Sequence, residues 1–264
     1  GFSAWADRKR QHKTALLTSV AVGATALGIL AVAPPEARLA VLAGVVLANV
    51  GFDLAAVFTG SLLATIATGR MADRLSAWGF AAGYAGGAIA LVLATAIVGA
   101  HDQLGLSTAG GLRAAFAFTG LWWILFSLPA AVAHFGEDRD GGHATTAAGE
   151  LLAFARTLVR PTHADHRQLA AVLIGSMLIL GAVQTAIAQF SSVALEEFSL
   201  APAALVRLVL LVQAVALPGA LAIGWLSERV GRKTALVTCL SGWIAVLVLA
   251  GFVQTVPQLY GLAV

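Results

Sequence analysis

The chain of 264 residues is 59% hydrophobic and only 11% charged, with a formal net charge of +3. Soluble domains carry about 25% charged residues, so this composition excludes an ordinary water-soluble protein. The apolar residues form long runs instead of alternating with polar ones, which argues against a membrane barrel. The basic residues lie in short clusters between the runs, as in the loops of membrane proteins, and do not indicate a nucleic-acid partner.

Seven segments of the chain are long and apolar enough to cross a membrane, since a membrane-spanning helix needs about 20 mostly apolar residues. These segments are 14–33, 38–67, 79–100, 114–135, 169–190, 203–226 and 235–254. Backbone polar groups inside a bilayer must be satisfied within their own segment, so each is expected to be a helix. The sequence therefore predicts an all-α integral membrane protein with membrane lipid as its main surroundings.

The basic residues indicate how the chain is oriented in the membrane. Seven spans place four hydrophilic segments on one side, namely 1–13, 68–78, 136–168 and 227–234. Of the 16 Lys and Arg residues, 13 fall on this side, and the remaining three are Arg38, Arg113 and Arg207. Basic residues concentrate in cytoplasmic loops, so this side is predicted to be cytoplasmic.

The longest hydrophilic stretch, 136–168, separates four spans from three. We therefore expect a first half over 1–135, a cytoplasmic linker over 136–168, and the beginning of a second half over 169–264. Within the linker, Glu150 to Val159 places its apolar residues mostly on one helical stripe. This pattern is typical of an amphipathic helix, either lying on the membrane surface or packed on the bundle.

Two loops of the chain resemble each other. Lys-Thr-Ala-Leu occurs at 13–16 and again at 233–236, and an acid-Arg pair precedes each copy, namely Asp7-Arg8 and Glu228-Arg229. Both copies fall in short loops on the predicted cytoplasmic side, and six spans lie between them. A repeat of six spans predicts two similar six-helix halves, which is the plan of major facilitator transporters.

The second loop, from Gly224 to Lys233 (GWLSERVGRK), resembles the loop signature of the major facilitator superfamily. Its glycines would permit a tight loop and a close approach between helices. The resemblance implies a gating loop in each half, made of Asp7, Arg8, Gly224, Glu228, Arg229, Gly231 and Arg232. On this plan the chain covers helices three to nine of twelve and begins helix ten. We therefore expect it to be a piece of a longer protein.

Three segments resemble a particular branch of that superfamily, the vacuole-effluxer-like (autophagy-related) permeases and their bacterial relatives. They are LSAWGFAAGYAGG at 75–87, the stretch from Arg113 to Pro129 with its LWWILFSLP ending, and LVQAVALPGA at 211–220. The resemblance implies a permease, in a bacterial cell (inner) membrane, and amino-acid export is known among the fungal relatives. It does not identify the substrate.

Few polar side chains lie deep inside the predicted spans. Asp53 is the single acid near the middle of one, and Asn49 precedes it by one helical turn. An intramembrane acid is costly, so Asp53 is expected either to serve a solute or proton pathway or to hydrogen-bond a neighbouring helix. Gln184 and Gln213 also need partners in lipid, so we expect them to face the bundle interior.

Small and aromatic residues point to sites of helix packing. Gly79, Gly83 and Gly87 recur every four residues on one stripe, where small residues let two membrane helices approach closely. Trp122 and Trp123 lie well inside a span, away from either membrane interface. Packing is the favoured interpretation of both features, and contact with a solute is the alternative.

These features predict a secondary transporter that moves a small solute by alternating access. No HExxH or GxSxG motif and no pair of intramembrane aspartates is present, so an enzyme is not expected. No phosphate-binding loop, metal site or cofactor site is predicted either. A proton gradient, another ion gradient or facilitated diffusion could drive transport, and a non-transporting receptor or scaffold remains the alternative.

Overall fold

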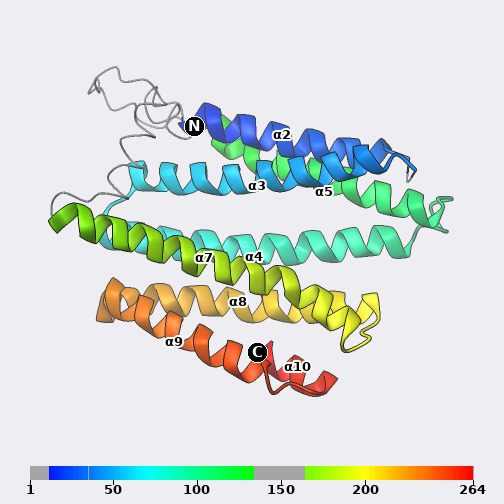
Figure 1. Ribbon diagram of the computed structural model, residues 1–264. Coiled ribbons are helices and arrows are strands. Elements are labelled where there is room, and N and C mark those ends of the chain that lie inside the picture. Colours follow the sequence, from blue (N-terminus) through cyan, green and yellow to red (C-terminus); the bar gives the residue numbers. More distant parts are fainter. Residues whose placement is uncertain (1–11, 35, 134–163, 264) are drawn as a thin grey trace.

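The computed structural model describes residues 12–34, 36–133 and 164–263, which form a bundle of helices (Figure 1). The helices in order are α2 (His12–Val32), α3 (Arg38–Ile66), α4 (Gly69–Gly99), α5 (Thr108–Val132), α7 (Ala164–Glu196), α8 (Pro202–Val230), α9 (Arg232–Ala250) and α10 (Val256–Leu262). In this part of the chain, all but the short α10 are long and apolar enough to cross a membrane. The predicted all-α membrane bundle of seven spans is therefore confirmed.

The helices lie side by side along one direction, so that their connections gather at two opposite ends of the bundle (Figure 1). α2 packs closely against both α3 and α5, and α4 packs along α8. Contacts between α3 and α4 are much sparser. The α4–α8 contact is the main one that joins helices before residues 134–163 to helices after them.

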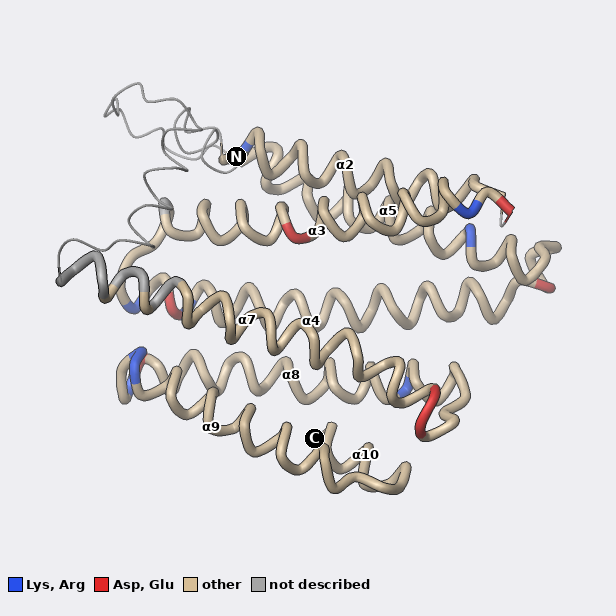
Figure 2. The backbone as a smooth tube through the Cα atoms, in the orientation of Figure 1, with Lys and Arg blue, Asp and Glu red and all other residues tan. Residues whose placement is uncertain are grey.

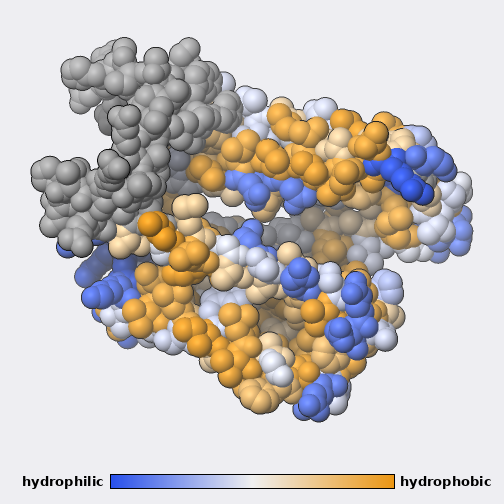
Figure 3. All heavy atoms as spheres, viewed as in Figure 1, coloured by the Kyte–Doolittle hydropathy of each residue, from blue (hydrophilic) through white to orange (hydrophobic). Residues whose placement is uncertain are grey.

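The buried core is small and lies between helices, whereas large apolar side chains cover much of the outside. Ala15, Leu16 and Val20 of α2 form one buried cluster with Phe58 and Leu62 of α3. By contrast, Leu39 on the surface of α3 is 83% exposed. Figure 3 shows apolar side chains over most of the flank of α2 and α3, with hydrophilic ones at the right-hand end and along the lower margin. This distribution suits a surface that lipid covers.

Glycines allow α2 and α3 to pack backbone against backbone. A Cβ atom built on Gly51 would lie 2.7 Å from the backbone nitrogen of Gly23 and 2.9 Å from the carbonyl oxygen of Ser19. On α5, the ring of Trp123 covers Gly23 and meets the Phe52 ring edge-on, with 6.2 Å between ring centroids. Trp123 therefore packs between helices, in agreement with the favoured interpretation of its position.

Two of the predicted loops are shorter than expected. Segment 68–78 was expected to be a loop, but α4 begins at Gly69 and contains nearly all of it. Good helix formers such as Met71, Ala72 and Leu75 occupy this stretch, so the helix continues beyond the apolar run. Segment 227–234 likewise reduces to Gly231 between α8 and α9, where φ is +87°, a value that residues with a Cβ rarely adopt.

Residues 1–11 and 134–163 lie outside the described part of the chain. The first copy of the loop motif, with Asp7 and Arg8, falls there. So do the predicted amphipathic helix, over 150–159, and most of the linker 136–168.

Candidate functional site

The contact between α4 and α8 brings together residues that the sequence analysis had singled out separately. Gly224 of α8 lies directly against the Cβ atom of Ala77 on α4, closer than any added side chain would permit. Further along the same interface, a Cβ atom built on Gly87 would be 2.8 Å from Nε2 of Gln213. Small residues therefore set how closely α4 and α8 approach, at two levels of the bundle.

An ion pair closes the end of this interface where α4 begins and α8 gives way to α9. Arg232 Nε donates to Asp73 Oδ1 at 2.8 Å and to Oδ2 at 3.0 Å. Arg232 Nη2 also donates to the carbonyl oxygen of Gly69 at 2.9 Å. The Asp73 side chain is 20% exposed, although that of Arg232 is 63% exposed. One guanidinium thus ties the start of α9 to the first turn of α4.

The other residues of the second loop motif stay close to the loop itself. The Arg229 guanidinium lies over the Trp225 ring, 4.1 Å from its centroid, one turn apart on α8. Glu228 is half-buried. Gly231 supplies the turn after which Arg232 opens α9 and reaches α4. The loop motif therefore positions the Arg232 side chain for contact with α4.

The partners of this motif on α4 were not identified in the sequence. Segment 68–78, which contains Gly69, Asp73 and Ala77, is predicted to be a loop. The three residues are spaced four apart, so on a helix they share one stripe. That spacing would have been a usable signal if the helix had been extended to Gly69.

Asp53 lies near the middle of α3, 15 residues after Arg38, where Figure 2 shows an acidic position on this helix. Its side chain is exposed. Asn49, one turn earlier on the same face, is also exposed, and its Nδ2 donates to the carbonyl oxygen of Val45 at 2.8 Å. Figure 3 shows an opening between α3 and the helices of the second part, with hydrophilic side chains on the α3 side. An exposed acid and an exposed amide therefore lie one turn apart on the same face of α3.

The predicted glutamines and glycines differ in their surroundings. Gln184 lies on α7 and is exposed, whereas Gln213 is half-buried against Gly87. A Cβ atom on Gly79 or Gly83 would meet no described atom within 4 Å. The glycine stripe of α4 therefore makes a close contact at Gly87 in the described part of the chain, and not at its two earlier members.

Comparison with known proteins agrees with these features. Residues 64–263 match the family described as vacuole effluxer Atg22 like. A Bacillus subtilis (strain 168) protein, the uncharacterized MFS-type transporter YxiO, is 24% identical over 249 residues. That alignment covers 92% of this chain and 57% of the relative, so the chain spans little more than half of the relative's length. No solved structure matches the chain.

The family match includes both helices of the α4–α8 interface and the loop before α9. The helices also have the length and apolar character that a membrane requires. The chain therefore belongs to the vacuole effluxer Atg22-like family, a branch of the major facilitator superfamily of membrane proteins.

Proposed function

We propose that this chain is part of a secondary transporter that moves a small solute across a membrane by alternating access. The observation that carries the proposal is the contact of Arg232 with Asp73 and Gly69, which joins two distant parts of the chain at one end of the bundle. Alternating access needs such a contact, because one end of the pathway must close while the other opens. A receptor or scaffold has no need of a contact that breaks and re-forms.

The two parts joined in this way correspond to the two halves of the proposed transporter, 1–135 and 169–264, with 136–168 as the linker. The excess of basic residues supports a cytoplasmic position for the α4–α9 contact, and the bacterial relative supports a bacterial inner membrane. Asp73 and Arg232 then form a cytoplasmic gate that separates when the pathway opens inward. The close packing of Ala77 on Gly224 supports this, since two surfaces without bulky side chains can separate and dock again.

The proposed solute pathway runs between the two halves of the bundle, with Asp53, Asn49, Gln184 and Gln213 as its candidate polar residues. Asp53 is the candidate proton carrier, because a carboxyl group near the bilayer centre costs about 2.5–3.5 kcal/mol when charged and is relieved by protonation. Amino acids are the first solute class to test. This choice rests on the resemblance to effluxers and on the mixed acid and amide character of the pathway.

The test is solute flux into liposomes that contain the complete purified protein. We expect uptake of at least one amino acid, and a several-fold lower rate for Arg232→Gln, which removes the contact with Asp73. Lys233→Gln is the matched control, since it removes the neighbouring exposed charge at the start of the same helix. Folded protein that transports no amino acid and no other small solute would favour the receptor or scaffold alternative.

A further inference from the structure

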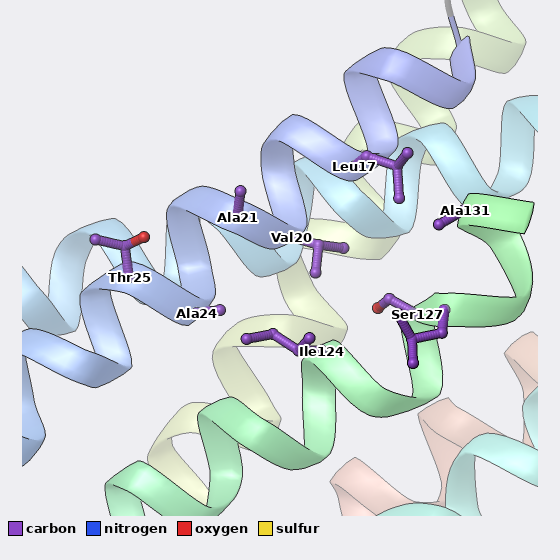
Figure 4. A pocket seen from close by; sticks show the side chains of 9 residues that line it. Leu17, Val20, Ala21, Ala24, Thr25, Ile124, Ser127 and Ala131 are labelled. Atoms are coloured by element: carbon purple, nitrogen blue, oxygen red, sulfur yellow. The ribbon is translucent and has the colours of Figure 1, made fainter.

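A groove of about 440 Å³ runs between α2 and α5 (Figure 4). Val20 and Ile124 face each other across it, and Leu17, Ala21 and Leu128 add to its apolar lining. Its volume falls within the range of about 300–1,000 Å³ that is usual for ligand pockets. The groove is therefore a lipophilic cleft in the part of the bundle that crosses the membrane.

The groove lies on the flank of α2 that α3 leaves open. Gly51 of α3 approaches α2 at Ser19 and Gly23, whereas the groove is lined by Ala21 and Ala24 on a different face of the same helix. Ala21 is exposed and Ala24 is half-buried. The described helices thus leave room beside α2 for an occupant from outside the bundle.

The groove, together with the turn of α2 that begins at Lys13, is about as long as one leaflet of a bilayer is thick. The groove lining runs from Leu17 to Thr25 on α2, and from Lys13 to Thr25 the helix advances 12 residues, or about 18 Å at 1.5 Å per residue. Half of a hydrocarbon core is about 15 Å thick. With Lys13 at the membrane interface, the groove extends to near the bilayer centre, which is the reach of a single acyl chain.

A fixed positive charge stands at the mouth of the groove. Lys13 precedes Leu17 by one turn on the same stripe of α2, and its Nζ donates to the carbonyl oxygen of Ala133 at 2.7 Å. Ala133 follows the groove residue Ala131 by two positions, so this bond holds the ammonium group where α2 and α5 meet. An ammonium group has three N–H donors, which leaves donors for a phosphate.

We propose that this groove binds an anionic phospholipid, with one acyl chain between α2 and α5 and its phosphate on Lys13. In a membrane, lipid is an apolar partner available to this flank of the described bundle, and the ammonium group favours a negative headgroup over a zwitterionic one. The proposal relies on the proposed orientation but not on transport activity.

Native mass spectrometry of the complete protein in detergent micelles tests the headgroup. Phosphatidylglycerol and phosphatidylcholine with identical acyl chains are added separately, and the bound lipids are counted. We expect several-fold more phosphatidylglycerol on the parent protein, and loss of this preference in Lys13→Gln. Lys13→Arg should keep it, because a guanidinium also binds phosphate. Lys233→Gln, at the equivalent position of the repeated loop, should not change it.

A second pair of variants tests the acyl chain. Ala21→Phe fills the groove and should reduce retention of both lipids several-fold, whereas Val22→Phe, the next residue and outside the groove lining, should not. Size-exclusion profiles and thermal midpoints establish that each variant is folded. The proposal is overturned if the parent protein shows no preference for phosphatidylglycerol over phosphatidylcholine. That result is expected if another segment of the protein fills the groove. The proposal is equally overturned if Lys13→Gln keeps the preference, or if Ala21→Phe retains lipid as the parent does. Each of these outcomes is independent of solute flux.

Discussion

Asp73 and Arg232 are 159 positions apart in the sequence, yet Arg232 Nε lies 2.8 Å and 3.0 Å from the two carboxylate oxygens of Asp73. A pair this exposed contributes little to the stability of the fold. The position of the ion pair suggests a different role. It joins the start of α9 to the first turn of α4, next to the close contact of Ala77 with Gly224.

Reversal of the two charges tests the gate. Asp73→Arg and Arg232→Asp should each make the cytoplasmic end open more often, because like charges then face each other. A cysteine placed at Gln213 in a Cys239→Ala background should react several-fold faster with a thiol reagent applied from the cytoplasmic side. The double variant should return towards the parent rate, since the pair re-forms with reversed signs. A double variant that reacts as fast as the singles would contradict the gate.

The contact of Gly224 with Ala77 predicts a steric effect at one glycine of α8. Gly224→Ala adds a Cβ atom where Ala77 leaves no space, so the helices must shift. Overpacking of this kind costs about 1–3 kcal/mol, and we expect a lower thermal midpoint in detergent micelles. Gly219→Ala on the same helix is the control, because its Cβ atom would meet nothing within 4 Å. Equal midpoints for the two variants would show that α4 and α8 do not pack this closely.

A similar comparison tests the α2–α3 interface. Gly51→Ala would press a methyl group against the backbone of Gly23, which cannot rotate away as a side chain can. We expect a loss of stability in the same range of about 1–3 kcal/mol. Gly60→Ala, in open space on the same helix, should be neutral or gain up to about 1 kcal/mol, because alanine is the better helix former. The measurement is the thermal midpoint, and a destabilised Gly60→Ala would argue against this view of α3.

Asp53→Asn tests the proposed proton carrier. The amide keeps the shape of the side chain but cannot carry a proton, so flux should fall at least tenfold or lose its dependence on a pH gradient. Membrane abundance should stay near that of the parent protein, since Asp53 is exposed among the described helices and the amide has nearly the same shape. Unchanged flux with an unchanged pH dependence would leave Asp53 as a residue without a role in transport.

The proposed orientation predicts on which side of the membrane each loop lies. Cysteines introduced singly at Thr145 and Gln103 in the Cys239→Ala background should differ in labelling by an impermeant reagent. In intact cells Gln103→Cys should react and Thr145→Cys should not, and Thr145→Cys should react once the cells are opened. Labelling of both positions in intact cells would reverse or refute the orientation.

The sequence alone determined the membrane class and the seven spans, because the transfer of about 20 apolar residues into a bilayer depends only on their composition. It also indicated that Gly224 allows a close approach and that Gly231 forms the turn, since both follow from the lack of a Cβ atom. Asp53 could also be identified from the sequence, because it is an acid in the middle of an apolar span. These are properties of single segments, so they can be predicted before any two helices are docked.

The tertiary structure decided which side chains meet. The partner of Arg232 could not be predicted, because it depends on the extension of α4 to Gly69 and on the rotation that turns Asp73 towards α9. Gly87 meets Gln213, whereas Gly79 and Gly83 meet no described atom, although all three share one stripe, because only part of this stripe comes close to α8. The lipophilic groove likewise exists only because α5 docks beside α2 on a flank that α3 does not cover. Contacts between distant segments depend on helix rotation and docking, which local composition does not determine.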